Sequence, residues 1–72
     1  MNLKEKLDAI AEILEVDLVK EEDVLSNFSN WDSMAVLGIM SLLEENDSNF
    51  DFSGEQIAEC IAVKDILKLM EN

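Results

Sequence analysis

The sequence contains no arginine, no histidine and no proline, and its single cysteine is Cys60. The lack of arginine leaves 5 lysines against 17 acidic residues, and the net charge of −12 excludes binding to nucleic-acid phosphates. One cysteine excludes a disulfide within the chain, and the first residues lack the apolar run of a secretory signal, so we expect a cytoplasmic location. The chain has many carboxylates but no histidine, so none of them can be assigned the role of general acid or general base, and we do not expect an enzyme.

Long apolar runs are also missing. The longest stretch without a charge, residues 33–43, is far below the ~20 apolar residues that span a bilayer, so no membrane span is expected. The chain of 72 residues predicts one domain, 1–72, which buries only about 60% of its unfolded surface. A hydrophobic share of 49% nevertheless suffices for a core.

Apolar residues recur at intervals of three and four, which predicts an all-α fold. Helices are expected over about 3–16, over 33–45, from a Ser53 cap with Gln56 through about Ile61, and around Val63, Ile66, Leu67 and Met70. A connection over 17–31 separates the first two helices, and its Val19, Val24, Leu25 and Phe28 are spaced to hold it on a core. The predicted fold is a small four-helix bundle with a long first loop and a short third helix.

The uncharged segment 33–43 is anomalous in a chain with 31% charged residues. One face of this helix, made by Val36, Ile39, Met40 and Leu43, suffices to pack against the other helices, and a neighbouring face holds Met34, Leu37 and Ser41. A bundle of this size cannot enclose a helix on every side, so we expect part of this surface to form a docking site. The alternative is that the long loop covers Met34 and Leu37 as ordinary core.

The charges around this segment have one sign. Between Lys20 and Lys64 the sequence holds ten carboxylates and no cation, among them Glu44 and Glu45 at the end of the uncharged helix. A partner that docks here is therefore expected to be basic. The alternative is an acidic surface that serves only solubility.

Ser33 stands at the start of the same helix. Asp32 is placed to cap this helix, and Trp31 and Val36 have the spacing of a hydrophobic staple. As the first residue inside the helix, Ser33 lies where unpaired N–H groups and the helix dipole favour an attached anion. Taken alone, a serine after a capping aspartate is a common helix start.

Taken together, these features resemble the acyl carrier protein family along essentially the whole chain. Asp32-Ser33-Met34 matches the family's Asp-Ser-Leu or Asp-Ser-Met signature, Glu44-Glu45 matches the acidic helix end, and 62–65 lies where the family has a Thr-Val helix opening. The resemblance implies that Ser33 accepts 4′-phosphopantetheine from coenzyme A through a phosphopantetheinyl transferase. The chain would then be a monomeric carrier that presents thioesters to acyl-loading and acyl-transfer enzymes with basic docking patches.

The resemblance also implies site residues. The docking surface would comprise Met34, Leu37, Ser41, Glu44 and Glu45, and the acyl cleft Val36, Met40, Leu43, Ile57 and Ile61. The chain departs in two ways from carriers of bacterial fatty-acid synthesis. Those carriers have acidic residues along the exposed side of the second helix, where this chain is expected to have Ala35 and Gly38. They also have a large apolar residue at the position of Ser41. Asn30 stands where the family commonly has glycine, and we expect the change to be tolerated because asparagine also adopts positive φ. Ala62 stands where the family has threonine and lacks the hydroxyl that would cap the last helix.

Several readings remain open. The pathway is either fatty-acid biosynthesis or a specialised pathway, and the lack of acidic residues along the exposed side of the second helix favours the specialised one. D-alanyl and peptidyl carriers share the signature, so an aminoacyl cargo is a further alternative. A helical interaction module without a prosthetic group is the alternative from another class. Asp47, Asn49 and Asp51 imitate a calcium loop, but Phe52 and Ala58 stand where glycine and glutamate are required, so no metal site is expected. Cys60 has no visible base nearby and is expected to be structural.

Overall fold

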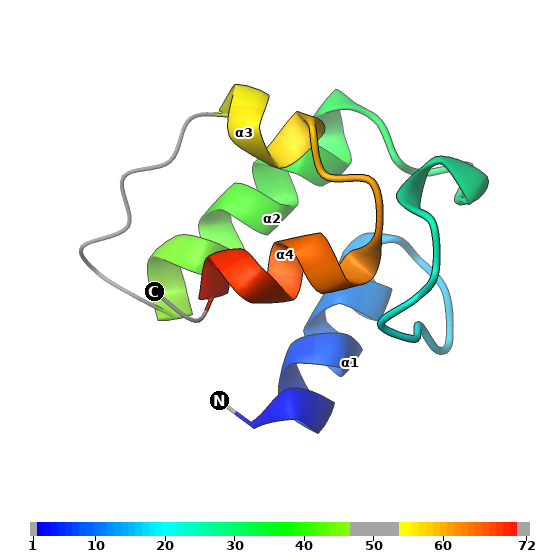
Figure 1. Cartoon of the computed structure of the whole chain (residues 1–72), viewed down its shortest axis with the longest axis vertical. Helices are drawn as coiled ribbons and strands as arrows, with labels where there is room; N and C mark the ends of the chain where they lie inside the picture. Colours follow the sequence, from blue (N-terminus) through cyan, green and yellow to red (C-terminus); the bar gives the residue numbers. More distant parts are fainter. Residues whose placement is uncertain (1, 47–53, 71–72) are drawn as a thin grey trace.

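The computed structural model describes residues 2–46 and 54–70. These residues form α1 (Leu3–Ile13), a short 3-10 helix η1 (Leu25–Asn27), α2 (Ser33–Asn46), α3 (Gly54–Ala58) and α4 (Val63–Met70). Within these ranges the chain has no strand, only one isolated bridge, so the predicted all-α class is confirmed. The central element is α2, which contacts α1, α3 and α4 (Figure 1). None of the helices in the described part is long and apolar enough to cross a membrane.

The helix α1 begins at a capping box that the sequence analysis missed. Asn2 Oδ1 accepts a hydrogen bond from the Glu5 backbone N–H at 2.8 Å, and Glu5 Oε1 accepts one from the Asn2 N–H at 3.1 Å. The helix ends earlier than the predicted residue 16, because Glu15 adopts a left-handed φ of 60°. The Val16 N–H then turns back to the Ala11 carbonyl at 3.0 Å, as in a Schellman motif.

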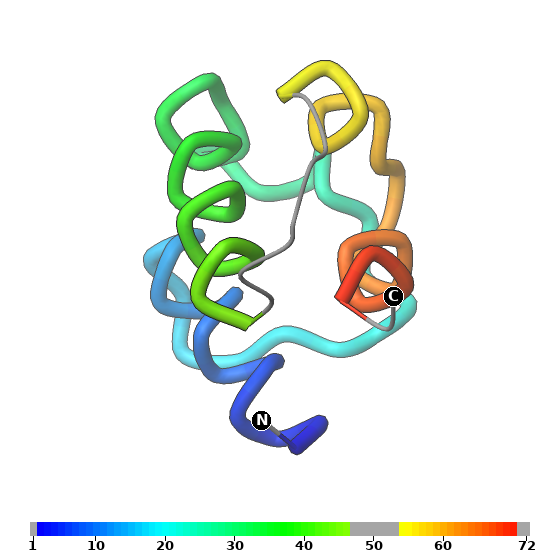
Figure 2. Tube along the Cα trace, turned by 90° about the vertical axis from the view of Figure 1, so that its left-hand side faces the viewer, coloured from blue at the N-terminus to red at the C-terminus, as the bar shows by residue number. Residues whose placement is uncertain are grey.

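The first loop leaves the end of α1, crosses to the side of α4, and returns to the start of α2 (Figure 2). Val19 and Leu25 are fully buried and Phe28 is half-buried, as predicted, whereas Val24 is exposed. The loop is therefore held by two deep apolar anchors and by the backbone bonds described next.

Three backbone hydrogen bonds, here called the loop clamp, join the first loop to the α3–α4 connection. Two of them satisfy N–H groups in the first turn of α4, which otherwise lack partners. The bonds run from Val63 N–H to the Asp23 carbonyl (2.9 Å), from Lys64 N–H to the Glu21 carbonyl (2.9 Å), and from Leu25 N–H to the Ile61 carbonyl (2.8 Å).

The start of α4 needs no capping side chain at Ala62. Asp65 Oδ2 accepts hydrogen bonds from the Ala62 and Ile61 N–H groups, both at 3.0 Å, and these bonds lower the pKa of Asp65. Together with the loop clamp they define the start at Val63, where the sequence predicted it.

The third helix is shorter than predicted. It ends at Ala58 rather than near Ile61, whose carbonyl instead accepts a hydrogen bond from Leu25 N–H in the first loop. The expected Ser53 cap lies outside the described residues. The helix α2 continues one residue beyond its predicted end, to Asn46, whose Nδ2 donates to the Met70 carbonyl at 3.1 Å.

The core lies between α2 and the other elements. It contains no buried polar side chain among the described residues. From α2 the buried residues are Ala35, Ile39, Leu42 and Leu43, so the core face is turned from the predicted one and Val36 and Met40 are only half-buried. The largest fully buried side chains are Ile10, Leu14, Leu25, Ile39, Leu43, Ile57 and Ile66.

Candidate functional site

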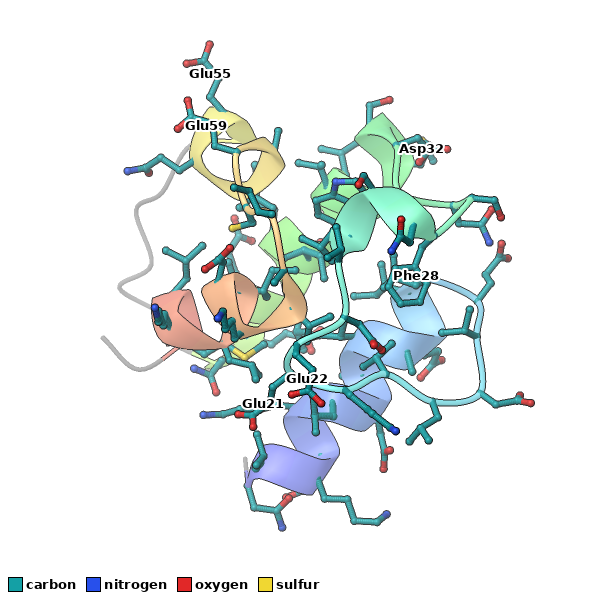
Figure 3. The ribbon with its side chains drawn as sticks, turned by 45° about the vertical axis from the view of Figure 1, so that its right-hand side comes forward. Glu21, Glu22, Phe28, Asp32, Glu55 and Glu59 are labelled. Carbon is teal, nitrogen blue, oxygen red and sulfur yellow. The ribbon has the colours of Figure 1, made fainter. Side chains whose placement is uncertain are left out.

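Ser33 is the first residue of α2, and its side chain is exposed. The preceding Asp32 caps the helix as predicted, because its Oδ1 accepts hydrogen bonds from Met34 N–H at 3.0 Å and Ala35 N–H at 3.1 Å. In Figure 3 Asp32 lies at the outer end of α2. The cap fixes the backbone of the first turn, so the Ser33 hydroxyl is presented to solvent from a rigid position at the positive end of the helix dipole.

Asn30 joins this helix start to the end of α1. Its Nδ2 donates to the Leu14 carbonyl at 3.1 Å and to Glu15 Oε2 at 2.8 Å. Among the described non-glycine residues only Glu15 has a positive φ, so the explanation of Asn30 by positive φ is wrong. The side-chain amide is what this position uses, since it satisfies a carbonyl at the C-terminus of α1.

An open apolar cleft of about 510 Å³ lies beside Ser33, between α2 and α3. Two of the predicted cleft residues, Val36 and Met40, line it. The prediction is wrong for Leu43 and Ile57, which are 1% and 0% exposed in the core, and for Ile61, which is 70% exposed to solvent. The full lining is Trp31, Asp32, Ser33, Val36, Leu37, Met40, Gly54 and Ala58.

Six of the eight lining residues were not predicted to line a cleft, although two of them, Asp32 and Ser33, were predicted to form the attachment site. The helical spacing of Ser33, Val36, Leu37 and Met40 carried a signal for Leu37, because these positions share one face. Trp31 was identified only as half of a hydrophobic staple, and it lines the cleft together with Val36. Gly54 and Ala58 had no signal, since they reach the cleft only through the packing of α3 on α2.

Gly54 lies at a close approach between α3 and α2. A Cβ atom at this position would lie 3.3 Å from Met40 Cε and 3.9 Å from Val36 Cγ1. The missing side chain therefore leaves room in the cleft, and any larger residue at this position would occupy it.

The predicted docking residues of α2 are exposed. Met34 is 73% and Leu37 is 55% exposed, so the alternative in which the loop covers them is wrong. Ser41, Glu44 and Glu45 are also exposed. Ala35, in contrast, is only 4% exposed and does not belong to the outer side of the helix, where the sequence analysis placed it.

Carboxylates are also exposed on elements other than α2. Figure 3 shows Glu55 and Glu59 pointing outward from α3, and Glu21 and Glu22 on the first loop near α4. The single ion pair within the described ranges joins Lys4 to Asp8 at 3.2 Å, on α1. In residues 2–46 and 54–70 no three His, Cys, Asp or Glu side chains form a group that could hold a metal ion. The residues 47, 49, 51 and 52 of the calcium-loop comparison lie outside the described residues.

The thiol of Cys60 is unsuited to nucleophilic chemistry. Burial raises its pKa, and the nearby carboxylates of Asp65 and Glu59 raise it further, so the thiol stays protonated at neutral pH. Cys60 Sγ lies 3.6 Å from the Gln56 carbonyl, to which it donates. This geometry agrees with the structural role expected from the sequence.

Comparison of the chain with protein-family models, with curated proteins and with solved structures found no match.

Proposed function

We propose that this chain is an acyl carrier protein, a four-helix bundle that carries 4′-phosphopantetheine on Ser33. The observation that supports this proposal above all is the position of Ser33. Its exposed hydroxyl stands at the capped start of α2 and at the edge of the apolar cleft, so an arm attached there begins beside a shelter for apolar cargo.

The attachment chemistry suits this position. Ser33 Oγ would attack a phosphorus of coenzyme A, the phosphoanhydride bond would break, and adenosine 3′,5′-bisphosphate would leave. The chain has no histidine or arginine, so the phosphopantetheinyl transferase would supply the base that takes the Ser33 proton and the metal ion. The phosphodiester product carries a negative charge, which the N-terminus of α2 favours by a few tenths of a kcal/mol or more.

The attached arm would end in a thiol that holds an acyl group as a thioester. Tethering gives each partner enzyme a high local concentration of cargo without a new binding site. Partner enzymes with basic patches would dock on the exposed α2 residues Met34, Leu37, Ser41, Glu44 and Glu45, attracted by the acidic surface. The carrier itself would act as a cytoplasmic monomer and perform no catalysis.

The cleft favours an apolar acyl cargo over an aminoacyl cargo. Its walls are mostly the side chains of Trp31, Val36, Leu37 and Met40, and placing an ammonium group there would carry a desolvation penalty. Fatty-acid biosynthesis or a specialised acyl pathway therefore fits better than D-alanyl or peptidyl carriage.

Incubation with coenzyme A, magnesium and a broad-specificity transferase, followed by intact mass measurement, tests this proposal. We expect one phosphopantetheine adduct on the parent chain and none on Ser33→Ala. Ser29→Ala, which removes another exposed serine of the same region, serves as the matched control and should be modified fully. Absence of the adduct with several transferases, or an adduct that persists in Ser33→Ala, would refute the proposal.

The exposure of Met34 and Leu37 also favours a second function, an interaction module without a prosthetic group. In that case Leu37→Asp would abolish partner binding whereas Ser33→Ala would change nothing in the cell. The variant Ser33→Ala therefore distinguishes the two functions, because it removes the carrier function and leaves an interaction module intact.

A further inference from the structure

A left-handed residue stands at the point where the chain leaves α1. Glu15 has a φ of 60°, and among the described non-glycine residues it is the one with a positive φ. This conformation brings the Cβ atom of an L-residue close to a carbonyl oxygen, so glycine or asparagine is the usual residue at such a helix end. Glutamate is therefore unfavourable for the backbone here, and it differs from glycine in offering a carboxylate.

The Glu15 carboxylate binds the last part of the first loop. Its Oε2 accepts a hydrogen bond from Asn30 Nδ2 at 2.8 Å, and the same nitrogen, which carries two hydrogens, donates to the Leu14 carbonyl at 3.1 Å. Leu14 is buried in the core with 1% of its surface exposed, so its carbonyl is a fixed point. The two bonds hold Asn30 against the end of α1.

Trp31 follows Asn30 directly in the chain. It is half-buried, packs against the core and lines the cleft. Its N–H donates to the Phe28 carbonyl at 3.1 Å, which is a bond within the first loop, and the next residue, Asp32, caps α2. Phe28 and Asp32, between which Trp31 lies along the chain, are labelled in Figure 3. Within the described ranges, the hydrogen bonds that join this segment to the end of α1 are those of Asn30.

The position of Trp31 decides the shape of the cleft beside Ser33. Both residues line the cleft, and the indole is the largest of the lining side chains. A wall of a binding site keeps its position only when the residues behind it are themselves held by packing and hydrogen bonds. A shift of this segment relative to α1 would move the indole, and the cleft would then widen at the start of α2.

We propose that Glu15 and Asn30 are positioning residues that hold Trp31 in the wall of the cleft, so that the end of α1 controls the width of the cleft beside Ser33. Neither of the two residues lines the cleft. The unfavourable backbone of Glu15 is then the local cost of the bond that it makes, as for strained residues that support a functional site. In a loaded carrier the sheltered group would be the acyl chain, and this extension alone rests on the proposed function.

The intrinsic fluorescence of the chain reports on this wall, because Trp31 is its one tryptophan and the chain has no tyrosine. Asn30→Asp keeps the size of the side chain, but a carboxylate at neutral pH cannot donate. We expect acrylamide to quench Trp31 about two-fold more strongly in this variant, and the affinity for the neutral apolar probe N-phenyl-1-naphthylamine to fall about five-fold. Asn27→Asp makes the same charge change at an exposed asparagine of the first loop, and this control should behave like the parent chain.

Two variants of Glu15 separate positioning from stability. Glu15→Gly removes the acceptor of the 2.8 Å bond but also relieves the left-handed conformation. We therefore expect its Tm to stay within about 2 °C of that of the parent chain or to rise, while the quenching of Trp31 increases and the probe affinity falls. Glu15→Gln keeps an acceptor oxygen and should restore both values to those of the parent chain. A merely structural role of Glu15 would change the Tm and leave the environment of Trp31 in the folded chain unchanged.

Unchanged quenching and probe affinity in Asn30→Asp and Glu15→Gly would overturn the proposal, since Trp31 would then be held without these two residues. Equal changes in Asn30→Asp and Asn27→Asp would also overturn it, because they would trace the effect to charge. Circular dichroism at the assay temperature verifies that each variant is folded, and Glu15→Gly alone decides the question if Asn30→Asp is not. All measurements use the chain without a prosthetic group, so failure of Ser33 to accept 4′-phosphopantetheine would leave their result unchanged.

Discussion

Replacing Asp32 tests whether the candidate attachment site depends on a single capping carboxylate. Asp32→Ala removes the acceptor of two hydrogen bonds, from the Met34 and Ala35 N–H groups at 3.0 and 3.1 Å. Loss of such a cap lowers the free energy of unfolding by about 1 kcal/mol. In a domain of this size that corresponds to a fall in Tm of about 4–8 °C, a large share of a total stability of a few kcal/mol.

Thermal unfolding followed by circular dichroism measures this effect, and Asp32→Asn is the control. Both variants remove one negative charge from a chain of net charge −12, but asparagine keeps an oxygen that can accept from the same N–H groups. We therefore expect Asp32→Asn to unfold within about 2 °C of the parent chain and Asp32→Ala well below it. Equal Tm values for the two variants would refute the argument that the cap, rather than the charge, stabilises the start of α2.

Two further predictions concern α4 and the cleft. The hydrogen bonds that the Asp65 carboxylate accepts from the Ala62 and Ile61 N–H groups lower its pKa in the folded state. The carboxylate therefore stabilises the fold at pH values above its ordinary pKa of 3.8, and this stabilisation is lost as the pH falls through the lower pKa of the folded state. Asp65→Ala should thus lower the free energy of unfolding by up to about 1 kcal/mol at neutral pH and by clearly less under more acidic conditions. Urea titration at the two pH values measures this difference, and a loss that does not depend on pH would contradict the reasoning. Gly54→Leu should fill the cleft and abolish binding of an apolar fluorescent probe, whereas Gly54→Ala should retain most of it. Unchanged probe binding by Gly54→Leu would show that the probe binds elsewhere.

The sequence predicts best what neighbouring residues determine. The start of α2 depends on Asp32 and on backbone groups two and three residues later, so its position and its cap follow from local chemistry. The burial of Val19 and Leu25 agrees with their apolar character, but that character does not by itself predict burial, because Leu18 and Val24 of the same connection are 66% and 37% exposed. The exposed Met34 follows from the small size of the fold, which cannot enclose a helix that is apolar on all sides.

Features that depend on distant segments were not predictable. The end of α3 is set by the Ile61 carbonyl, which pairs with Leu25 more than thirty residues earlier in the chain. The rotation of α2 is set by its packing against three other helices, and it moves Leu43 from the predicted cleft into the core. The early end of α1 has another cause, because glutamate rarely adopts the left-handed conformation that Glu15 shows.

The loop clamp gives the first loop an influence on the cleft. A helix of five residues such as α3 is not stable on its own in water, so its position depends on the packing of Ile57 and on the bond that holds the Ile61 backbone. Residues 21–25 thus help to fix the location of a cleft wall although none of them lines the cleft. Substitutions in the first loop could therefore change the size of the cleft while every residue that lines it stays the same.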